Sequence, residues 1–178
     1  MNRLVYERFG SKNGFVRFLG HSFLAQMGVY KRFSNTLPES FQRLVFVCNG
    51  NICRSPLAEV YARSLGKQAA SCGLNCGDGF PADPRAKRFA EAQGLTLDSH
   101  KTVNVRAFEF RKTDFIVVME PSHIASFQEK VSRDYPVVLA GSYCRSANPY
   151  IHDPFNCCDE FFTHCESKVM EAVRGICG

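Results

Sequence analysis

One stretch of the sequence is most informative about the fold: Val45-Phe46-Val47-Cys48-Asn49-Gly50-Asn51-Ile52-Cys53-Arg54-Ser55-Pro56. Along it the residue types change twice, from apolar residues to turn-forming residues and then to residues typical of a helix start. An apolar run that ends at Cys48 predicts a buried strand, and Ser55-Pro56 is typical of a helix start. Between them, Gly50 and Asn51 both tolerate the left-handed backbone of a tight turn. The stretch therefore predicts a strand, a tight loop and a helix in direct succession.

The predicted loop combines an anion site with a nucleophile. Backbone N–H groups between a strand end and a helix start converge on one point, and the helix N-terminus adds partial positive charge. Arg54 closes the loop, and the field that holds an anion also stabilises a thiolate at Cys48. A buried cysteine at the end of a core strand is the plainer alternative, but it leaves Gly50, Asn51 and Ser55-Pro56 unexplained.

The rest of the chain alternates strand and helix patterns. Strands are expected over 43–47, 69–74, 113–119 and 137–140, and helices over 55–65, 84–93, 122–132 and 158–175. Asp83 and Ser122 are the expected N-caps of the second and third of these helices. This alternation predicts an α/β fold with a doubly wound, four-stranded parallel sheet flanked by helices. The phosphate-binding loop after the first strand then lies beyond the carboxyl ends of the strands, where ligands bind in such sheets.

The net positive charge is concentrated in the N-terminal part of the chain. Residues 1–40 hold six basic and two acidic side chains, a net charge of +4 out of +5 for all 178 residues. We expect a basic amphipathic extension over 1–40 and one domain over 41–178, and the basic balance is then no argument for nucleic-acid binding. Nine cysteines, an odd number, with no secretory pattern and no membrane-spanning apolar run, predict a reducing cytoplasmic location.

Apolar side chains recur at helical spacing within residues 14–33. They are Phe15, Phe18, Leu19, Phe23, Met27 and Tyr30, with Val16 and Leu24 beside them. One hypothesis is an extra helix packed on the domain, followed by a linker over 34–40. The other is a basic aromatic helix that lies on an anionic membrane, binds a partner or associates with a second copy of this chain.

The whole pattern resembles the low-molecular-weight protein tyrosine phosphatases. The stretch around Cys48 looks like the active-site loop of that family, and further landmarks follow in the family's order. These are Ala70-Ser71-Cys72-Gly73, Pro81-Ala82-Asp83-Pro84-Arg85-Ala86, Ser99-His100, Val118-Met119-Glu120 and His152-Asp153-Pro154-Phe155. The resemblance covers residues 43–176 and does not explain the N-terminal segment.

The resemblance implies hydrolysis of phosphotyrosine through a phosphocysteine intermediate, with no metal or cofactor. Cys48 is then the nucleophile, Arg54 holds the phosphate, and Asp153 is the general acid. Asp83-Pro84 is a second Asp-Pro pair, which we interpret as a helix cap. The residues expected to bind phosphate or organise the loop are Asn49, Gly50, Asn51, Ile52, Cys53 and Ser55, with the hydroxyl of Ser55 assisting the thiolate.

Supporting roles follow from the same resemblance. Ser71 and His100 are expected to support the loop from behind, and Asn49 and Phe155 to form the walls of the substrate cleft. Ile52 favours phosphotyrosine over phosphoarginine, because relatives that act on arginine carry threonine there. Cys53 is either a redox partner that forms a reversible disulfide with Cys48 or a small packed residue.

Several other functions stay open at this point. A phosphoarginine phosphatase, a thiol-based arsenate reductase and a catalytically inactive phosphotyrosine-binding module would share the loop. A zinc site is a further option, drawn from His152, Cys157, Cys158, His164 and Cys165. The expected partners are phosphotyrosine proteins, with autophosphorylating tyrosine kinases among them.

Overall fold

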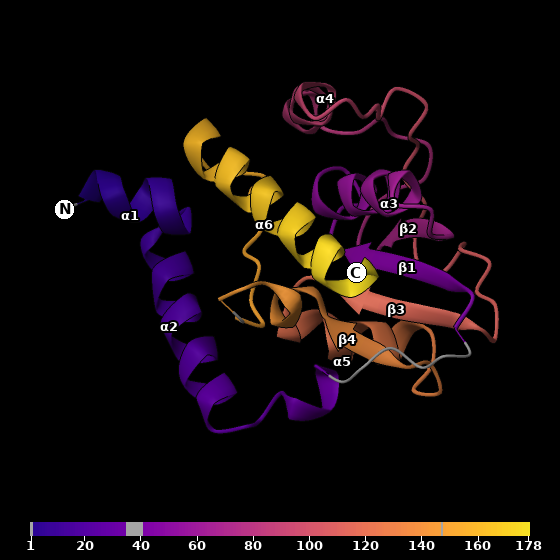
Figure 1. The fold of residues 1–178 in the computed structure, drawn as a ribbon, viewed down its shortest axis with the longest axis horizontal. Helices are drawn as coiled ribbons and strands as arrows, with labels where there is room; N and C mark the ends of the chain where they lie inside the picture. Colours follow the sequence, from indigo (N-terminus) through magenta and orange to yellow (C-terminus); the bar gives the residue numbers. More distant parts are fainter. Residues whose placement is uncertain (1, 35–40, 147) are drawn as a thin grey trace.

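The computed structural model describes residues 2–34, 41–146 and 148–178, and the described strands form one parallel sheet. Its strands are β1 (Arg43–Cys48), β2 (Ala69–Gly73), β3 (Asp114–Val118) and β4 (Val137–Leu139). The order β2-β1-β3-β4 places β1 between β2 and β3, with all neighbours parallel (Figure 1). The predicted doubly wound, four-stranded sheet is confirmed.

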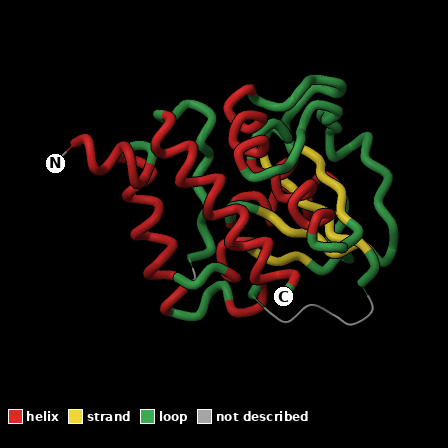
Figure 2. The backbone as a smooth tube through the Cα atoms, turned by 45° about the horizontal axis from the view of Figure 1, so that its top comes forward, coloured by secondary structure: helices red, strands yellow, loops and turns green. Residues whose placement is uncertain are grey.

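Helices cover both faces of the sheet (Figure 2). They are α3 (Arg54–Ser64), α4 (Pro84–Ala92), α5 (Pro121–Lys130) and α6 (Asp159–Cys177), with short 3₁₀ turns η1 (Lys31–Phe33) and η2 (Ala140–Tyr143). Leu44 and Phe46 of β1 point to the face covered by α3 and α6, whereas Val45 and Val47 point to the face covered by α5. Both sets are fully buried, which explains why β1 is a continuous apolar run.

The helix starts show what the sequence patterns could resolve. Asp83 is the N-cap of α4, and its side chain accepts a hydrogen bond from Arg85 N at 2.8 Å, as expected. Ser122 was expected to cap α5, and this is wrong: Glu120 is the N-cap. Pro121 occupies the first turn instead, because its fixed φ suits that position and it needs no N–H partner there.

The N-terminal residues form two helices, α1 (Asn2–Phe9) and α2 (Lys12–Gln26), which turn at Gly10 with φ +75°. A Cβ at Gly10 would lie 2.7 Å from Cys157 Sγ, so the elbow sits tightly on the domain. Helix α1 packs on α6, and α2 lies beside the loop that precedes α6 (Figure 1). The division at residue 40 stays a prediction, and the expected linker residues 35–40 lie outside the described residues.

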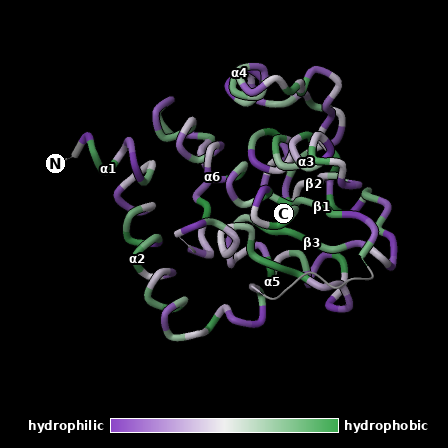
Figure 3. The backbone as a smooth tube through the Cα atoms, viewed as in Figure 1, coloured by the Kyte–Doolittle hydropathy of each residue, from purple (hydrophilic) through white to green (hydrophobic). Residues whose placement is uncertain are grey.

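The apolar positions of α2 occupy two faces. Phe15 and Phe18 pack on Phe9, with ring centroids 4.8 and 5.1 Å apart. The helix ends at Gln26, so Tyr30 lies beyond it and hydrogen-bonds back to His21 at 2.8 Å, instead of continuing the predicted stripe. Hydrophobic residues recur along α2 (Figure 3), and the exposed side chains of Val16, Leu19, Phe23 and Met27 form an apolar face. No helix in the described part of the chain is both long and apolar enough to cross a membrane.

A carboxyl group lies within the buried core. Glu166 of α6 is fully buried, and neither of its oxygens has a hydrogen-bond partner among the described residues. Burial raises the pKa of Glu166 to about 8, although Arg54 counteracts part of this shift. Glu166 is therefore protonated in the folded protein at neutral pH and ionised in the unfolded chain.

This difference makes stability depend on pH. Because the folded state binds the extra proton, the free energy of unfolding should fall as pH rises, by about 1.4 kcal/mol per pH unit between the unfolded pKa and about pH 8. Glu166→Gln should remove this slope, whereas Glu129→Gln on the surface of α5 should retain it. Urea unfolding at a series of pH values measures both. Parallel slopes for wild type and Glu166→Gln would contradict the assignment.

Candidate active site

Strand β1 delivers Cys48 to the loop as a nearly buried thiol. Its Sγ lies 3.0 Å from Ser55 Oγ, at the start of α3, and accepts a hydrogen bond from Asn51 N at 3.2 Å. The left-handed turn expected at both Gly50 and Asn51 occurs at Asn51 alone, with φ +52°. The backbone thus folds around the sulfur and points an N–H group at it.

Asn51 holds the loop in this shape through both its side chain and its backbone. Its Nδ2 donates to Ser55 Oγ and to Ser71 Oγ, each at 2.9 Å, and its Oδ1 accepts from Val103 N at 3.0 Å. His100 Nε2 lies 2.8 Å from the Asn51 carbonyl oxygen and donates to it, because a carbonyl can only accept. Ser71 and His100 therefore lie behind the loop, where the sequence reasoning expected them.

The sequence reasoning missed Glu59 of α3, which extends this network. Ser71 Oγ donates a hydrogen bond to Glu59 Oε2 at 2.5 Å. The same hydroxyl accepts one from Asn51, so Ser71 links Asn51 to Glu59. Burial lowers the pKa of His100, which keeps its ring neutral near pH 7. The side chain and carbonyl of Asn51 thus contact neutral donors and acceptors, with the Glu59 carboxylate one hydrogen bond further away.

Arg54 is a buried guanidinium with three defined partners. Its Nη1 donates to Glu120 Oε1 at 2.7 Å and to the Ile151 carbonyl at 2.9 Å, and its Nη2 lies 2.7 Å from Asp153 Oδ2. Its Nε has no partner among the described residues. Burial lowers the pKa of Arg54, but Asp153 and Glu120 outweigh this effect and raise it, so the side chain stays charged.

Glu120 and His123 complete the setting of Arg54, and the sequence reasoning assigned neither a role. Glu120 lies two residues after the end of β3, and His123 Nε2 lies 3.6 Å from Glu120 Oε1. Burial and Arg54 lower the pKa of His123 to about 3, so it stays neutral and Arg54 keeps its carboxylate partners. An acidic residue at the end of a core strand was the available signal for Glu120.

The loop that carries Asp153 is fixed by hydrogen bonds from a second arginine. Arg85 of α4 donates from Nη2 to the Phe155 carbonyl at 2.6 Å and from Nη1 to the Cys157 carbonyl at 3.0 Å. Asp153 Oδ1 accepts from Phe155 N at 3.1 Å, which forms an Asx turn at the Asp-Pro pair. The two Asp-Pro pairs thus differ: Asp83 caps a helix, and Asp153 faces Arg54.

A cavity of about 170 Å³ opens above the sulfur. It is lined by Cys48, Asn49, Gly50, Ile52, Cys53, Arg54, Asp153 and Phe155. Asn49 and Phe155 are exposed at its rim, and Asn49 Oδ1 accepts from Asn75 Nδ2 at 2.7 Å. The structure therefore brings the nucleophile, acid and anion-binding residues expected from the sequence to one cavity.

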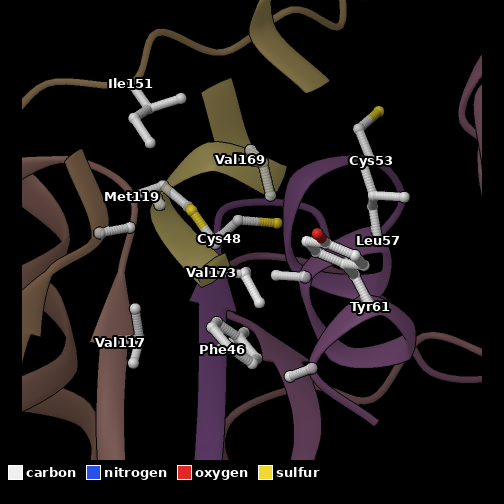
Figure 4. Close-up of a cluster of buried hydrophobic side chains, with 14 of the residues drawn as sticks. Phe46, Cys48, Cys53, Leu57, Tyr61, Val117, Met119, Ile151, Val169 and Val173 are labelled. Carbon is white, nitrogen blue, oxygen red and sulfur yellow. The ribbon is translucent and has the colours of Figure 1, made fainter. Parts of the chain in front are cut away.

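Cys53 is a buried thiol whose side chain points away from Cys48 (Figure 4). Burial raises the pKa of Cys53, which disfavours its thiolate. All nine cysteines lie in the described residues and carry free thiols. A disulfide between Cys48 and Cys53 would require the loop to rearrange, and it stays a prediction.

Of the residues considered for zinc, Cys165 and His152 make hydrogen bonds within the protein, and Cys158 is exposed. Cys165 Sγ donates to the His152 carbonyl at 3.3 Å, and His152 Nδ1 hydrogen-bonds to the Tyr150 hydroxyl. Across the described ranges, no group of three or more His, Cys, Asp or Glu side chains is placed to hold a metal ion.

Comparisons with known proteins agree with this geometry. The profile of the family "Low molecular weight phosphotyrosine protein phosphatase" matches residues 43–177. The chain is 37% identical over 141 residues to the low molecular weight protein-tyrosine-phosphatase Etp of Escherichia coli K12, covering 75% of this chain and 91% of Etp. It is 39% identical over 88 residues to Wzb of Salmonella typhi, and that match spans 48% of this chain and only 59% of Wzb.

A solved structure extends the similarity to three dimensions. The tyrosine phosphatase amsI of Erwinia amylovora superposes with a TM-score of 0.69 at 26% identity, covering 80% of this chain and 96% of amsI. The family match begins at the first residue of β1, so it excludes α1 and α2. By its sequence, its fold and its cysteine loop, the chain belongs to the low-molecular-weight protein tyrosine phosphatase family.

Proposed function

We propose that this protein hydrolyses phosphotyrosine through a phosphocysteine intermediate, with Cys48, Arg54 and Asp153 in the catalytic roles. One observation carries the proposal: Cys48 Sγ and the guanidinium of Arg54 line the same small cavity as Asp153. Arg54 leaves Nε without a partner there, while Nη1 is held from behind by Glu120 and Ile151. The Nε–Nη2 edge matches two oxygens of one phosphate, once Asp153 releases Nη2.

The first chemical step forms the phosphocysteine. The Cys48 thiolate attacks phosphorus while the bond between phosphorus and the phenolic oxygen breaks, and protonated Asp153 gives its proton to that oxygen. Ser55, 3.0 Å from the sulfur, donates to the thiolate and stabilises it as the leaving group of the next step. Arg54 and the loop N–H groups hold the equatorial oxygens throughout.

The second step regenerates the enzyme. The Asp153 carboxylate takes a proton from water, the resulting hydroxide oxygen bonds to phosphorus, and the phosphorus–sulfur bond breaks to release phosphate and the thiolate. The Arg85 hydrogen bonds to the loop support this dual role, because they keep Asp153 close to the cavity in both steps.

The cavity walls support an aryl phosphate as the substrate. Phe155 presents an exposed ring at the rim, where it can stack on a phenyl group, and Ile52 gives the cavity an apolar side. We further propose phosphotyrosine proteins as natural substrates, with autophosphorylating tyrosine kinases among them, as the family resemblance implies. Phosphoarginine, phosphoserine and arsenate provide the comparison panel that separates this function from its alternatives.

Replacement of the nucleophile tests the first step. Cys48→Ser should abolish turnover of an aryl phosphate yet retain binding of vanadate or phosphate, because the N–H groups and Arg54 remain. Arg54→Lys should be severely impaired, since one ammonium cannot reach Glu120, Ile151 and the phosphate together. Cys158→Ser, an exposed cysteine, is the matched control and should keep full activity. Substantial turnover by Cys48→Ser would refute the mechanism.

Replacement of the acid tests proton transfer. Asp153→Asn should lower kcat/KM, which reports formation of the phosphocysteine, by about 10²–10⁴-fold for phenyl phosphate and much less for p-nitrophenyl phosphate, because a good leaving group needs no proton. Asp83→Asn is the control: asparagine still caps α4, so this variant should lose no more than about 1 kcal/mol of stability, through its weakened pairing with Arg85, and treat both substrates alike. Steady-state kinetics and thermal unfolding measure these effects. Equal losses for both substrates in Asp153→Asn would mean that Asp153 is structural.

We also propose that the exposed apolar face of α2 contacts an anionic membrane surface. Its members Val16, Leu19, Phe23 and Met27 are between 50% and 68% exposed. Residues 1–40, which include α2, hold six of the chain's 22 basic residues, and these supply the charge that anionic lipids attract. An apolar face of aromatic and aliphatic side chains normally has a binding partner.

Truncation tests this proposal and the division at residue 40 together. A chain that lacks residues 1–38 should still unfold cooperatively and hydrolyse an aryl phosphate, because the four strands and the cysteine loop all follow residue 40. Full-length protein should sediment with phosphatidylserine vesicles in a salt-sensitive manner, and the truncated form should not. Failure of the truncated chain to fold would make α1 and α2 part of the core. Vesicle-independent dimers of the full chain would instead assign the face to a second copy.

A further inference from the structure

A second cavity adjoins the catalytic one. It measures about 270 Å³ and shares Asn49 and Asp153 with the cavity above Cys48. Ser122 and Ser126, one turn apart on α5, form one wall, and Arg17 of α2 lines the cavity from the N-terminal extension. The two cavities are therefore adjacent at the side chains of Asn49 and Asp153.

One cation, Arg17, and two carboxylates, Glu120 and Asp153, line this cavity. Both carboxylates are held at 2.7 Å by Arg54, which lies outside the lining. Arg17 is exposed and its side chain hydrogen-bonds to Tyr150, but in the described ranges no salt bridge pairs it with a carboxylate. Arg17 is therefore the charged lining residue that can pair with an acidic group of a ligand.

A lysine that lies outside the lining is bound to two of the wall residues and brings a further positive charge close to the cavity. Lys130, at the end of α5, donates from Nζ to the Leu74 carbonyl at 2.8 Å and to Asn75 Oδ1 at 2.5 Å. Leu74 and Asn75 are themselves wall residues of the second cavity. The remaining polar groups of the wall, including Ser122, Ser126 and Asn75, can all donate hydrogen bonds to an anion.

We propose that this cavity is a subsite for an acidic group of the substrate, a carboxylate or a second phosphate close in sequence to the phosphotyrosine. The subsite rests on the proposed phosphatase function and adds a specificity determinant to it. Arg17 precedes the residues that match the family, so this chain's own extension supplies the determinant. Attraction between Arg17 and the acidic group would then add to the binding of phosphotyrosine itself.

Peptide kinetics test the subsite. Three phosphotyrosine peptides are compared, with a glutamate, a second phosphotyrosine or a glutamine at the same neighbouring position. The full-length wild type should favour each acidic peptide over the glutamine peptide by about three- to tenfold in kcat/KM at low salt, and less at high salt. The two acidic peptides show whether a carboxylate or a phosphate is preferred.

Variants of Arg17 locate the effect. Arg17→Ala should remove most of the preference, Arg17→Glu should reverse it, and Arg17→Lys should retain it. Lys12→Ala, which removes the same charge from the start of α2, is the matched control and should keep the wild-type ratio. An unchanged ratio in Arg17→Glu would overturn the subsite. Failure of the wild type to hydrolyse even an aryl phosphate would instead overturn the proposed function.

Discussion

The buried guanidinium of Arg54 is the constraint on which the site depends. A charge that is 1% exposed is costly unless it is paired, and its partners come from two separate segments of the chain. Glu120 follows β3, whereas the Ile151 carbonyl and the Asp153 carboxylate lie in the segment before α6. Pairing this one side chain therefore aligns the cysteine loop, the segment after β3 and the Asp153 loop, while Nε has no partner among the described residues.

The N-terminal extension is joined to this arrangement through the residues before Asp153. His21 stacks on Tyr150 with ring centroids 5.0 Å apart, and Asn148 Nδ2 donates to Ser22 Oγ at 2.5 Å. A Cβ at Gly14 would lie 3.2 Å from the His152 ring, so α2 approaches that residue closely. One side of α2 thus packs beside the cleft, and its other side presents the exposed apolar face.

Local patterns in the sequence could predict the sheet and the cysteine loop, because each depends on short stretches with a distinctive order. The choice of Asp153 over Asp83 as the expected acid followed from the family resemblance. Asp83 was predictable as a cap from its local pattern, whereas Ser122 failed because Pro121 one residue earlier has the stronger preference for the first turn. The ends of most elements differ by only a residue or two from the predicted ranges.

Features that depend on tertiary contacts were not predictable. Glu120 and His123 matter because the sheet brings them to Arg54, and Arg85 matters because α4 lies beside the Asp153 loop. The apolar pattern over 14–33 looked like one stripe, but helix α2 ends at Gln26 and its apolar residues divide between a packed and an exposed face. No periodicity in the sequence could show that Arg17 reaches the cleft.

Trapping of the phosphocysteine would show whether Cys48 is the residue that accepts the phosphoryl group. Asp153→Asn should react with p-nitrophenyl phosphate, whose leaving group needs no acid, and should then lose phosphate slowly, because no carboxylate activates water. Acid quenching followed by peptide mass spectrometry should find one phosphoryl group on Cys48 and none on Cys53. A burst of nitrophenol without phosphorylated Cys48, or with the phosphoryl group on another residue, would contradict the account.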